Sequence, residues 1–188
     1  MIAETSLNAR IPPAWQPLVQ QQVFRSLLTA FAYPGRIAVL PEGQALLHTL
    51  AALIDSETSL ADVTGQIAED DLRRLAARPA TPETARFVVA DGAAAPGFTP
   101  CLGSLDSPEY GATLIVRVAK IGEGTALQLA GPGIAKTQRV QINGLHSAWL
   151  SARAEWNAGF PLGVDFLFVA ADQAVALPRT TGIVEGGH

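Results

Sequence analysis

The stretch FPLGVDFLFVAADQAVALPRTT, residues 160–181, holds two apolar segments separated by a short polar turn. Runs rich in β-branched and aromatic residues, bounded by turn residues, are typical of strands, so this stretch predicts a β-hairpin. The end of the hairpin is too polar for a core, because Arg179, Thr180 and Thr181 follow one another there. This cluster is either a solvated exit from the sheet or a surface that faces an anion or a partner chain.

A carboxylate lies at the start of the first predicted strand of this hairpin. Asp165 precedes an otherwise apolar run, and a buried carboxylate requires a partner. Arg179, at the other end of the hairpin, can supply that partner. A structural salt bridge is the interpretation that we favour for this pair.

The rest of the chain alternates between helical and extended patterns. Apolar residues at three-to-four spacing make one face of the clearest helix, residues 17–32, and Phe24 and Leu28 belong to that face. We also predict helices over 44–54, 69–78 and 145–157, and strands over 36–40, 59–63, 86–90, 112–119 and 126–130. The last two strands are expected to pair as a hairpin across a Gly-Glu-Gly turn. The alternation predicts an α/β layered domain with a mixed sheet.

Three segments of unequal size are expected. Residues 1–15 resemble an extended arm, because Pro12-Pro13 excludes a regular helix, and Trp15 can pin this arm to the body or to a neighbouring chain. A single α/β domain is expected over 16–183, followed by a tail at 184–188. Residues 92–110 form a long loop, which in a compact domain is often functional or bound to a partner.

The composition favours a chain with partners. It has 188 residues, of which 48% are hydrophobic and only 16% charged, and a mean hydropathy of +0.24. A covered interface, in an oligomer or a complex, accounts for this better than a slightly apolar monomer does. The net charge of −4 and the scattered cations argue against nonspecific nucleic-acid binding. Neither a signal-like start nor a membrane span is apparent, so the cytoplasm is the expected compartment.

Few residues suggest a cofactor or a catalytic centre. Cys101 is the only cysteine, and three dispersed histidines make no zinc set. Neither lysine, Lys120 nor Lys136, has the setting of a Schiff-base residue. Gly131 and Gly133, in the motif GPGI, can form a phosphate loop, but Pro132 lacks a donor N–H, so we favour a plain turn. We therefore predict no catalytic residue, no metal and no cofactor.

Several short motifs occur in order along the chain: FRSLL at 24–28, YPG at 33–35, GATLI at 111–115, LAGPGI at 129–134, FPLGVD at 160–165 and LPRTT at 177–181. Together they resemble the PhnH family, the H subunit of the bacterial carbon–phosphorus lyase complex that breaks down phosphonates. Each motif is modest alone, and FPLGVD with LPRTT at this spacing is the most specific combination. The resemblance covers roughly residues 20–182.

This resemblance implies a fold and a set of partners. The implied fold is a three-layer sandwich with a mixed β-sheet, similar to the large domain of PLP-dependent transferases but without the PLP site. The implied assembly is a homodimer that joins the G, I and J subunits. The resemblance also implies that the complex's early step displaces adenine from ATP with a phosphonate, giving ribose 1-phosphonate 5-triphosphate, and that the I subunit carries that chemistry.

The resemblance supplies no catalytic residue, so motif positions serve as candidates for an interface or an anion-binding surface: Arg179, Thr180, Thr181, Asp165, Gly131 and Gly133. The first hypothesis is a non-catalytic but essential subunit. The alternative is a transferase component that binds a nucleotide or a phosphonate directly through GPGI and LPRTT. A stand-alone pyridoxal enzyme is the third possibility.

Overall fold

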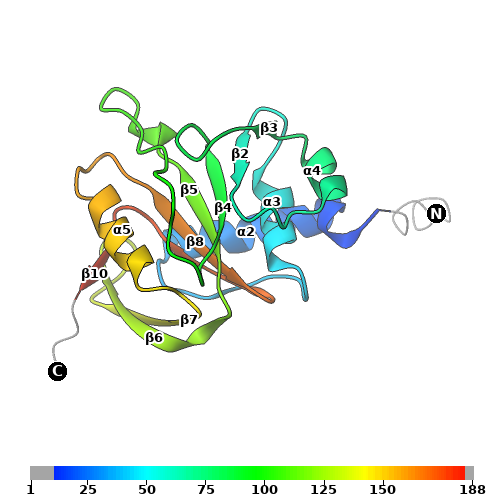
Figure 1. Ribbon diagram of the computed structural model, residues 1–188. Helices are drawn as coiled ribbons and strands as arrows, with labels where there is room; N and C mark the ends of the chain where they lie inside the picture. Colours follow the sequence, from blue (N-terminus) through cyan, green and yellow to red (C-terminus); the bar gives the residue numbers. More distant parts are fainter. Residues whose placement is uncertain (1–10, 185–188) are drawn as a thin grey trace.

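The computed structural model describes residues 11–184, and its centre is a mixed seven-stranded sheet (Figure 1). Five neighbouring strands are parallel, and β8, β9 and β1 pair in antiparallel fashion. The α/β class and the mixed sheet are thereby confirmed. In spatial order the strands are β1 (Ala38–Val39), β9 (Gln173–Leu177), β8 (Asp165–Ala170), β5 (Thr113–Arg117), β4 (Phe87–Asp91), β2 (Ser59–Asp62) and β3 (Arg78–Pro79).

The predicted hairpin within residues 160–181 is confirmed. In β8 and β9, Phe166 lies opposite Leu177 and Ala170 lies opposite Gln173. Side chains alternate between the two faces of the sheet, as the period of a strand requires. Phe166 and Phe168 belong to one core cluster, whereas Leu167 and Val169 belong to the other. Both faces of the sheet are therefore covered.

A second, three-stranded sheet has the order β10-β6-β7, with β6 (Lys120–Ala130), β7 (Gln138–Asn143) and β10 (Gly182–Val184). The predicted hairpin between 112–119 and 126–130 is therefore wrong. Strand β5 already has β4 and β8 on its two sides, which leaves it no free edge for β6. The expected Gly-Glu-Gly turn lies inside β6, where the register with β7 shifts between Ile121 and Thr125. The glycines permit this irregularity because both have positive φ.

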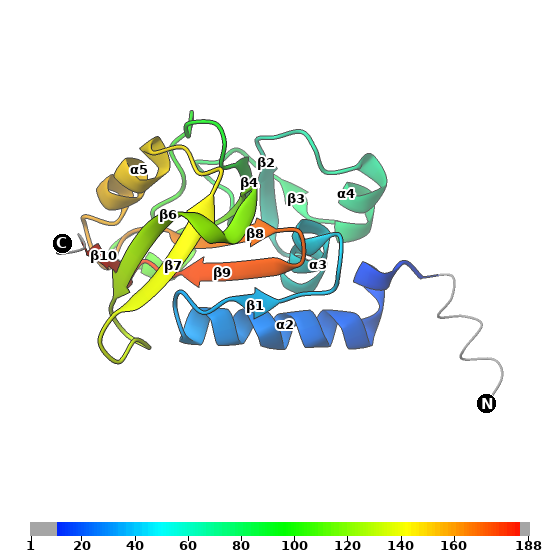
Figure 2. The same ribbon diagram turned by 90° about the horizontal axis from the view of Figure 1, so that it is seen from below.

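The helices divide between the two faces of the large sheet (Figure 2). On one face lie α2 (Pro17–Ala32), α3 (Ala45–Leu53) and α4 (Glu69–Leu75), and on the other lie α5 (Ala148–Trp156) and the small sheet. Two short 3-10 helices, η1 (Pro13–Trp15) and η2 (Pro108–Tyr110), complete the described elements. The elements thus form three layers, with the large sheet in the middle.

Three predicted helices differ from the structure at their ends. Helix α3 covers 45–53 within the expected 44–54. Helix α4 stops at Leu75 rather than residue 78, because Ala76 takes a left-handed conformation and Arg78 already belongs to β3. The residue before a proline avoids helical geometry, and Pro79 follows Arg78. Helix α5 covers 148–156 within the expected 145–157.

The N-terminal end differs from the expected extended arm over its last residues. Pro13–Trp15 form a 3-10 helix, in which Ala14 is buried and Trp15 packs against the core cluster beneath α2 and α3. The remainder of the expected arm, residues 1–10, and the tail beyond residue 184 lie outside the described residues. Within residues 11–184, no helix is both long and apolar enough to cross a membrane.

The apolar face predicted for 17–32 is only partly turned inward. Val23 and Leu27 are buried under the sheet, but Phe24 is 43% and Leu28 is 53% exposed. The apolar stripe of α2 is wider than the part of the helix that the sheet covers. This leaves large apolar side chains of α2 in contact with solvent in the isolated chain.

Candidate functional site

The predicted ion pair between Asp165 and Arg179 is present at the base of the β8–β9 hairpin. Arg179 Nη2 lies 2.8 Å from Asp165 Oδ2, and the Arg179 backbone N–H donates to Asp165 Oδ1 at 2.7 Å. The hairpin produces this contact because Arg179 lies two residues after Leu177, which pairs with Phe166 at the start of β8. Both side chains are mostly buried, so this is an interior ion pair.

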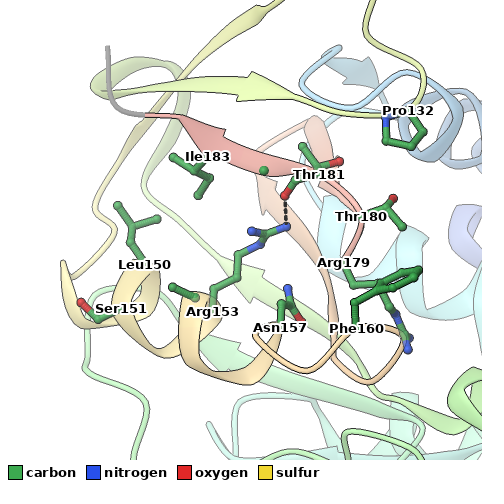
Figure 3. A pocket seen from close by; sticks show the side chains of 12 residues that line it. Pro132, Leu150, Ser151, Arg153, Asn157, Phe160, Arg179, Thr180, Thr181 and Ile183 are labelled. Atoms are coloured by element: carbon green, nitrogen blue, oxygen red, sulfur yellow. Dashed lines mark hydrogen bonds between the residues drawn. The ribbon is translucent and has the colours of Figure 1, made fainter. Parts of the chain in front are cut away.

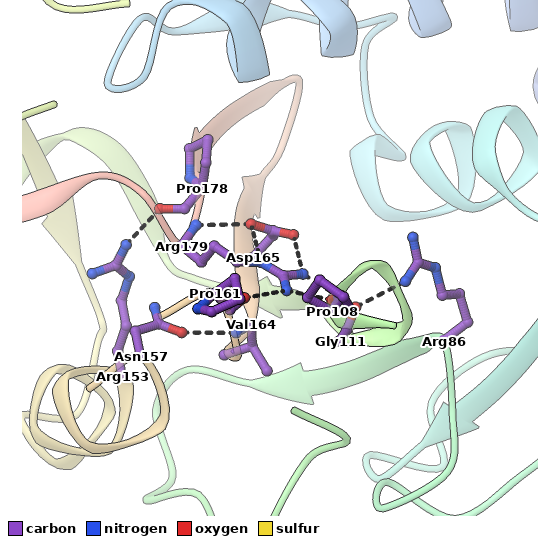
Figure 4. A network of polar contacts seen from close by, with 10 residues as sticks. All are labelled: Arg86, Pro108, Gly111, Arg153, Asn157, Pro161, Val164, Asp165, Pro178 and Arg179. Atoms are coloured by element: carbon purple, nitrogen blue, oxygen red, sulfur yellow. Dashed lines mark hydrogen bonds and ion pairs between the residues drawn. The ribbon is translucent and has the colours of Figure 1, made fainter. Parts of the chain in front are cut away.

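Arg179 also holds together the loops around it (Figure 4). Its Nη1 donates to the carbonyl oxygens of Pro108 at 2.7 Å and Pro161 at 3.5 Å, and its Nη2 donates to that of Gly111 at 3.4 Å. With Nε bound to Asp165, all five N–H groups of the guanidinium have acceptors within the chain. An external anion would have to displace one of these contacts, so the geometry favours a structural role for Arg179.

The two glycines of GPGI form a turn that packs against neighbouring backbone. The N–H of Ile134 donates to the carbonyl of Gly131, and both glycines have positive φ. A Cβ at Gly131 would lie 2.7 Å from the carbonyl oxygen of Thr180, and one at Gly133 would collide with that of Ala32. Gly131 therefore allows close approach of the end of β6 to the LPRTT segment, and Gly133 allows close approach of the turn to the end of α2, which is what the turn interpretation requires.

The two threonines of LPRTT have different settings. Thr180 is exposed, whereas Thr181 is buried and its Oγ1 has no hydrogen-bond partner in the described part of the chain. The N–H of Thr181 donates to the carbonyl of Pro178, which closes a tight turn before β10. Arg179, Thr180 and Thr181 all line one pocket.

This pocket, which we call the α5 pocket, lies between helix α5 and the segment that leads into β10 (Figure 3). Its volume is about 730 Å³, within the range of small-molecule sites. Two arginines and no acidic residue occur among the described residues that line it: Pro132, Leu150, Ser151, Arg153, Ala154, Asn157, Phe160, Arg179, Thr180, Thr181, Gly182 and Ile183. The lining of this pocket is therefore positively charged, although the chain as a whole has a net charge of −4.

Arg153 is the most unusual residue of the α5 pocket, because it is only 5% exposed and has no carboxylate in contact within residues 11–184. Its Nη2 donates to the carbonyl oxygens of Pro178 and Thr181, both at 2.8 Å. Its guanidinium carbon lies 5.8 Å from the centre of the Phe166 ring. Burial lowers the pKa of Arg153 from its ordinary value to about 10, and the negative charge of Asp165 opposes this only in part. The side chain is thus a fixed cation that lacks a counter-ion.

Arg153 was missed by the sequence-based prediction, although a signal was available. Trp149, Arg153 and Trp156 recur at four and three residues, so they share one face of α5, and all three are buried. An arginine between two tryptophans on the inward face of a helix is exceptional, since charged side chains are rarely buried without a partner. Asn157, one position beyond the helix, was not predicted as a pocket residue because no local sequence pattern marks it.

A second pocket, of about 430 Å³, lies at the carboxyl ends of β2 and β4. Open α/β sheets bind ligands at such ends where the strand order reverses, and here β3 and β4 lie on opposite sides of β2. Two of its polar groups are engaged within the chain, however. Asp91 accepts the N–H of Ala93, and Trp149 Nε1 donates to Ala94. This pocket offers a ligand fewer free partners than the α5 pocket does.

Other residues considered from the sequence do not form a reactive centre. His48 is buried within α3 as a packed side chain, as expected. Cys101 is half-buried, and Lys120 pairs with Glu123 at 2.8 Å. Among residues 11–184 no group of three or more potential ligands could hold a metal ion.

Comparison with known proteins identifies the family of the chain. Residues 13–184 match the sequence model of a family described as "Bacterial phosphonate metabolism protein (PhnH)". The chain is 47% identical, over its full length and that of the relative, to a Stutzerimonas stutzeri protein named "Putative C-P lyase subunit protein HtxG". It is 32% identical, over 86% of the chain and 88% of the relative, to the alpha-D-ribose 1-methylphosphonate 5-triphosphate synthase subunit PhnH of Rhizobium meliloti (strain 1021). The chain therefore belongs to the PhnH family of bacterial phosphonate metabolism proteins.

Proposed function

We propose that this protein is a non-catalytic but essential subunit of a carbon–phosphorus lyase complex that degrades organic phosphonates. The observation that carries this proposal is the family match over 13–184, together with two relatives whose names describe subunits of such systems. The step that it supports is the conversion of ATP and an alkylphosphonate to ribose 1-phosphonate 5-triphosphate and adenine. The expected compartment is the cytoplasm.

The surface of the chain supports a role among partner chains. Phe24 and Leu28 of α2 are exposed, and so is Val39, which is 67% exposed on the edge strand β1. Large apolar side chains and an unpaired strand edge are features that a partner covers. We propose a second copy of this chain and the G, I and J subunits as those partners. In this role the protein organises the active site of another subunit.

The finer details of the predicted fold also remain proposals. They are the likeness to the large domain of PLP-dependent transferases, the lack of a PLP site, and the extent of the single domain over 16–183. Neither lysine is in a setting that supports a Schiff base, because Lys120 is paired with Glu123 and Lys136 is exposed. Addition of pyridoxal phosphate to the purified protein should therefore produce no yellow adduct. A stoichiometric adduct would instead favour a pyridoxal enzyme.

Genetic complementation tests the proposed function. A strain that lacks its own H subunit should regain growth on methylphosphonate as sole phosphorus source when it expresses this chain with its cognate G, I and J subunits. Omission of this chain alone should abolish that growth. Equal growth with and without the chain would contradict an essential role in the complex.

The alternative, a component that binds a nucleotide or phosphonate directly, is favoured by one observation. Arg153 presents an unneutralised cation to a pocket of ligand size. Binding of a ligand does not require that this chain perform the chemistry. Turnover of ATP and methylphosphonate by the isolated chain would be needed to support the transferase version of this alternative.

A further inference from the structure

We propose that the α5 pocket binds the oxyanion group of a small molecule, with Arg153 and Asn157 as its principal binding residues. The anion is a phosphate or phosphonate group, carried either by a free phosphonate or by a nucleotide. The presence of an anion site follows from the pocket itself. The choice of phosphate or phosphonate among oxyanions rests on the proposed function.

The first argument is that the guanidinium of Arg153 is held in place, although only some of its N–H groups have hydrogen-bond acceptors. Two hydrogen bonds from Nη2 and the ring of Phe166 hold its guanidinium in place. Its Nε is buried without a partner, and its Nη1 makes no hydrogen bond to any residue within 11–184. A buried charge with free donors is costly unless an opposite charge meets it. An oxyanion supplies both the charge and the missing acceptors.

The second argument is that the other unsatisfied groups near Arg153 can also donate. Asn157 Oδ1 accepts the N–H of Val164 at 2.7 Å, which fixes the orientation of the amide and leaves Nδ2 buried without a partner. In Figure 3 that nitrogen points toward the segment that carries Thr180 and Thr181. The buried hydroxyl of Thr181 lacks a partner as well. Three of the six buried unsatisfied side-chain atoms within residues 11–184 thus belong to residues of this pocket.

The third argument concerns charge. The ion pair of Asp165 with Arg179 is neutral as a unit, so Arg153 leaves this region with one uncompensated positive charge. The absence of an acidic residue among the described lining residues means that nothing repels an incoming anion at the pocket itself. Leu150, Phe160 and Ile183 add apolar walls that suit the uncharged remainder of a small ligand.

Titration calorimetry of the purified full chain, in a low-salt buffer free of phosphate and sulfate, tests this inference. The probes are methylphosphonate, inorganic phosphate and ATP in separate experiments. We expect saturable one-to-one binding of at least one of them by the wild-type protein. Binding of methylphosphonate would point to a free phosphonate as the ligand, and binding of ATP alone would point to a nucleotide.

Two variants locate the binding. Arg153→Met removes the cation, and we expect it to weaken binding about tenfold or more, since a charge-assisted hydrogen bond contributes about that much. Asn157→Asp keeps the acceptor for Val164 and places a carboxylate beside Arg153, so it should weaken binding by a similar factor even if Arg153→Met fails to fold. Asn143→Asp, at an exposed position of strand β7 outside the pocket, is the matched control and should bind the probe within about twofold of wild type.

The inference is overturned if the folded wild-type protein shows no saturable binding of any probe, or if Asn157→Asp binds as tightly as wild type. Either result can occur while the complementation described above succeeds, in which case the anion site fails and the proposed function stands. Conversely, saturable binding without complementation would retain the site and refute the role in the complex.

Discussion

Replacing Asp165 by asparagine should destabilise the fold far more than removing a carboxylate from the surface. The substitution would keep a side-chain oxygen for the N–H of Arg179 but would remove the negative charge that faces the guanidinium at 2.8 Å. The side chains of Arg179 and Asp165 are only 13% and 22% exposed, so water can replace little of the lost attraction. The nearby cation of Arg153 would then lose its only attractive neighbour among the groups that influence its pKa.

The expected magnitude follows from the burial of the pair. Removing one partner of a buried ion pair costs about 3–5 kcal/mol, and the residual exposure reduces this to about 2–4 kcal/mol here. Arg73 and Glu69 on α4 provide the matched comparison, with side chains that are 64% and 83% exposed. Glu69→Gln should therefore cost less than about 1 kcal/mol.

Urea unfolding followed by circular dichroism measures both free energies of unfolding, provided that the slope with urea is unchanged among the variants. The double variant Asp165→Asn with Arg179→Met completes a thermodynamic cycle and should show a coupling of about 2 kcal/mol or more. If Asp165→Asn lowers the free energy of unfolding no more than Glu69→Gln does, the argument that the hairpin base depends on this pair is refuted.

Two further predictions concern the turn and the exposed helix. Gly133→Ala should lower the free energy of unfolding by about 2 kcal/mol or more, because φ is positive and a Cβ would meet the carbonyl of Ala32. Gly97→Ala, where a Cβ meets nothing within 4 Å, should change it by less than about 0.5 kcal/mol, and equal effects in urea unfolding would contradict the packing argument. Leu28→Asp should leave the melting temperature nearly unchanged but weaken self-association in sedimentation experiments, whereas Gln21→Asp on the same helix should alter neither. Unchanged self-association of Leu28→Asp would exclude this face of α2 from the interface.

The hairpin and its ion pair could be predicted from the sequence because both depend on local order. Strands β8 and β9 are adjacent in the chain, and their apolar runs are bounded by turn residues. Once they pair, Asp165 and Arg179 must lie at the same end. Helix α2 was predicted to the residue for a similar reason, since Pro17 starts it and Pro34-Gly35 follows its end.

The small sheet and the α5 pocket depend on contacts between distant segments. Strand β7 has only two buried residues, Val140 and Ile142, among polar neighbours, so its local pattern is weak. The partner of β6 was misassigned because proximity in sequence favoured β5, whose edges are taken by β4 and β8. Arg153 is buried against backbone carbonyls, and not against a carboxylate, because α5 packs on the segment before β10. No local sequence pattern predicts that packing.

Co-purification tests the central claim most directly. A tagged form of this chain, co-expressed with its cognate G, I and J subunits, should elute with them in stoichiometric amounts on size-exclusion chromatography with light-scattering detection. Elution of the tagged chain as a free monomer, with the other three subunits assembled without it, would contradict the claim that this protein acts as a subunit of the complex.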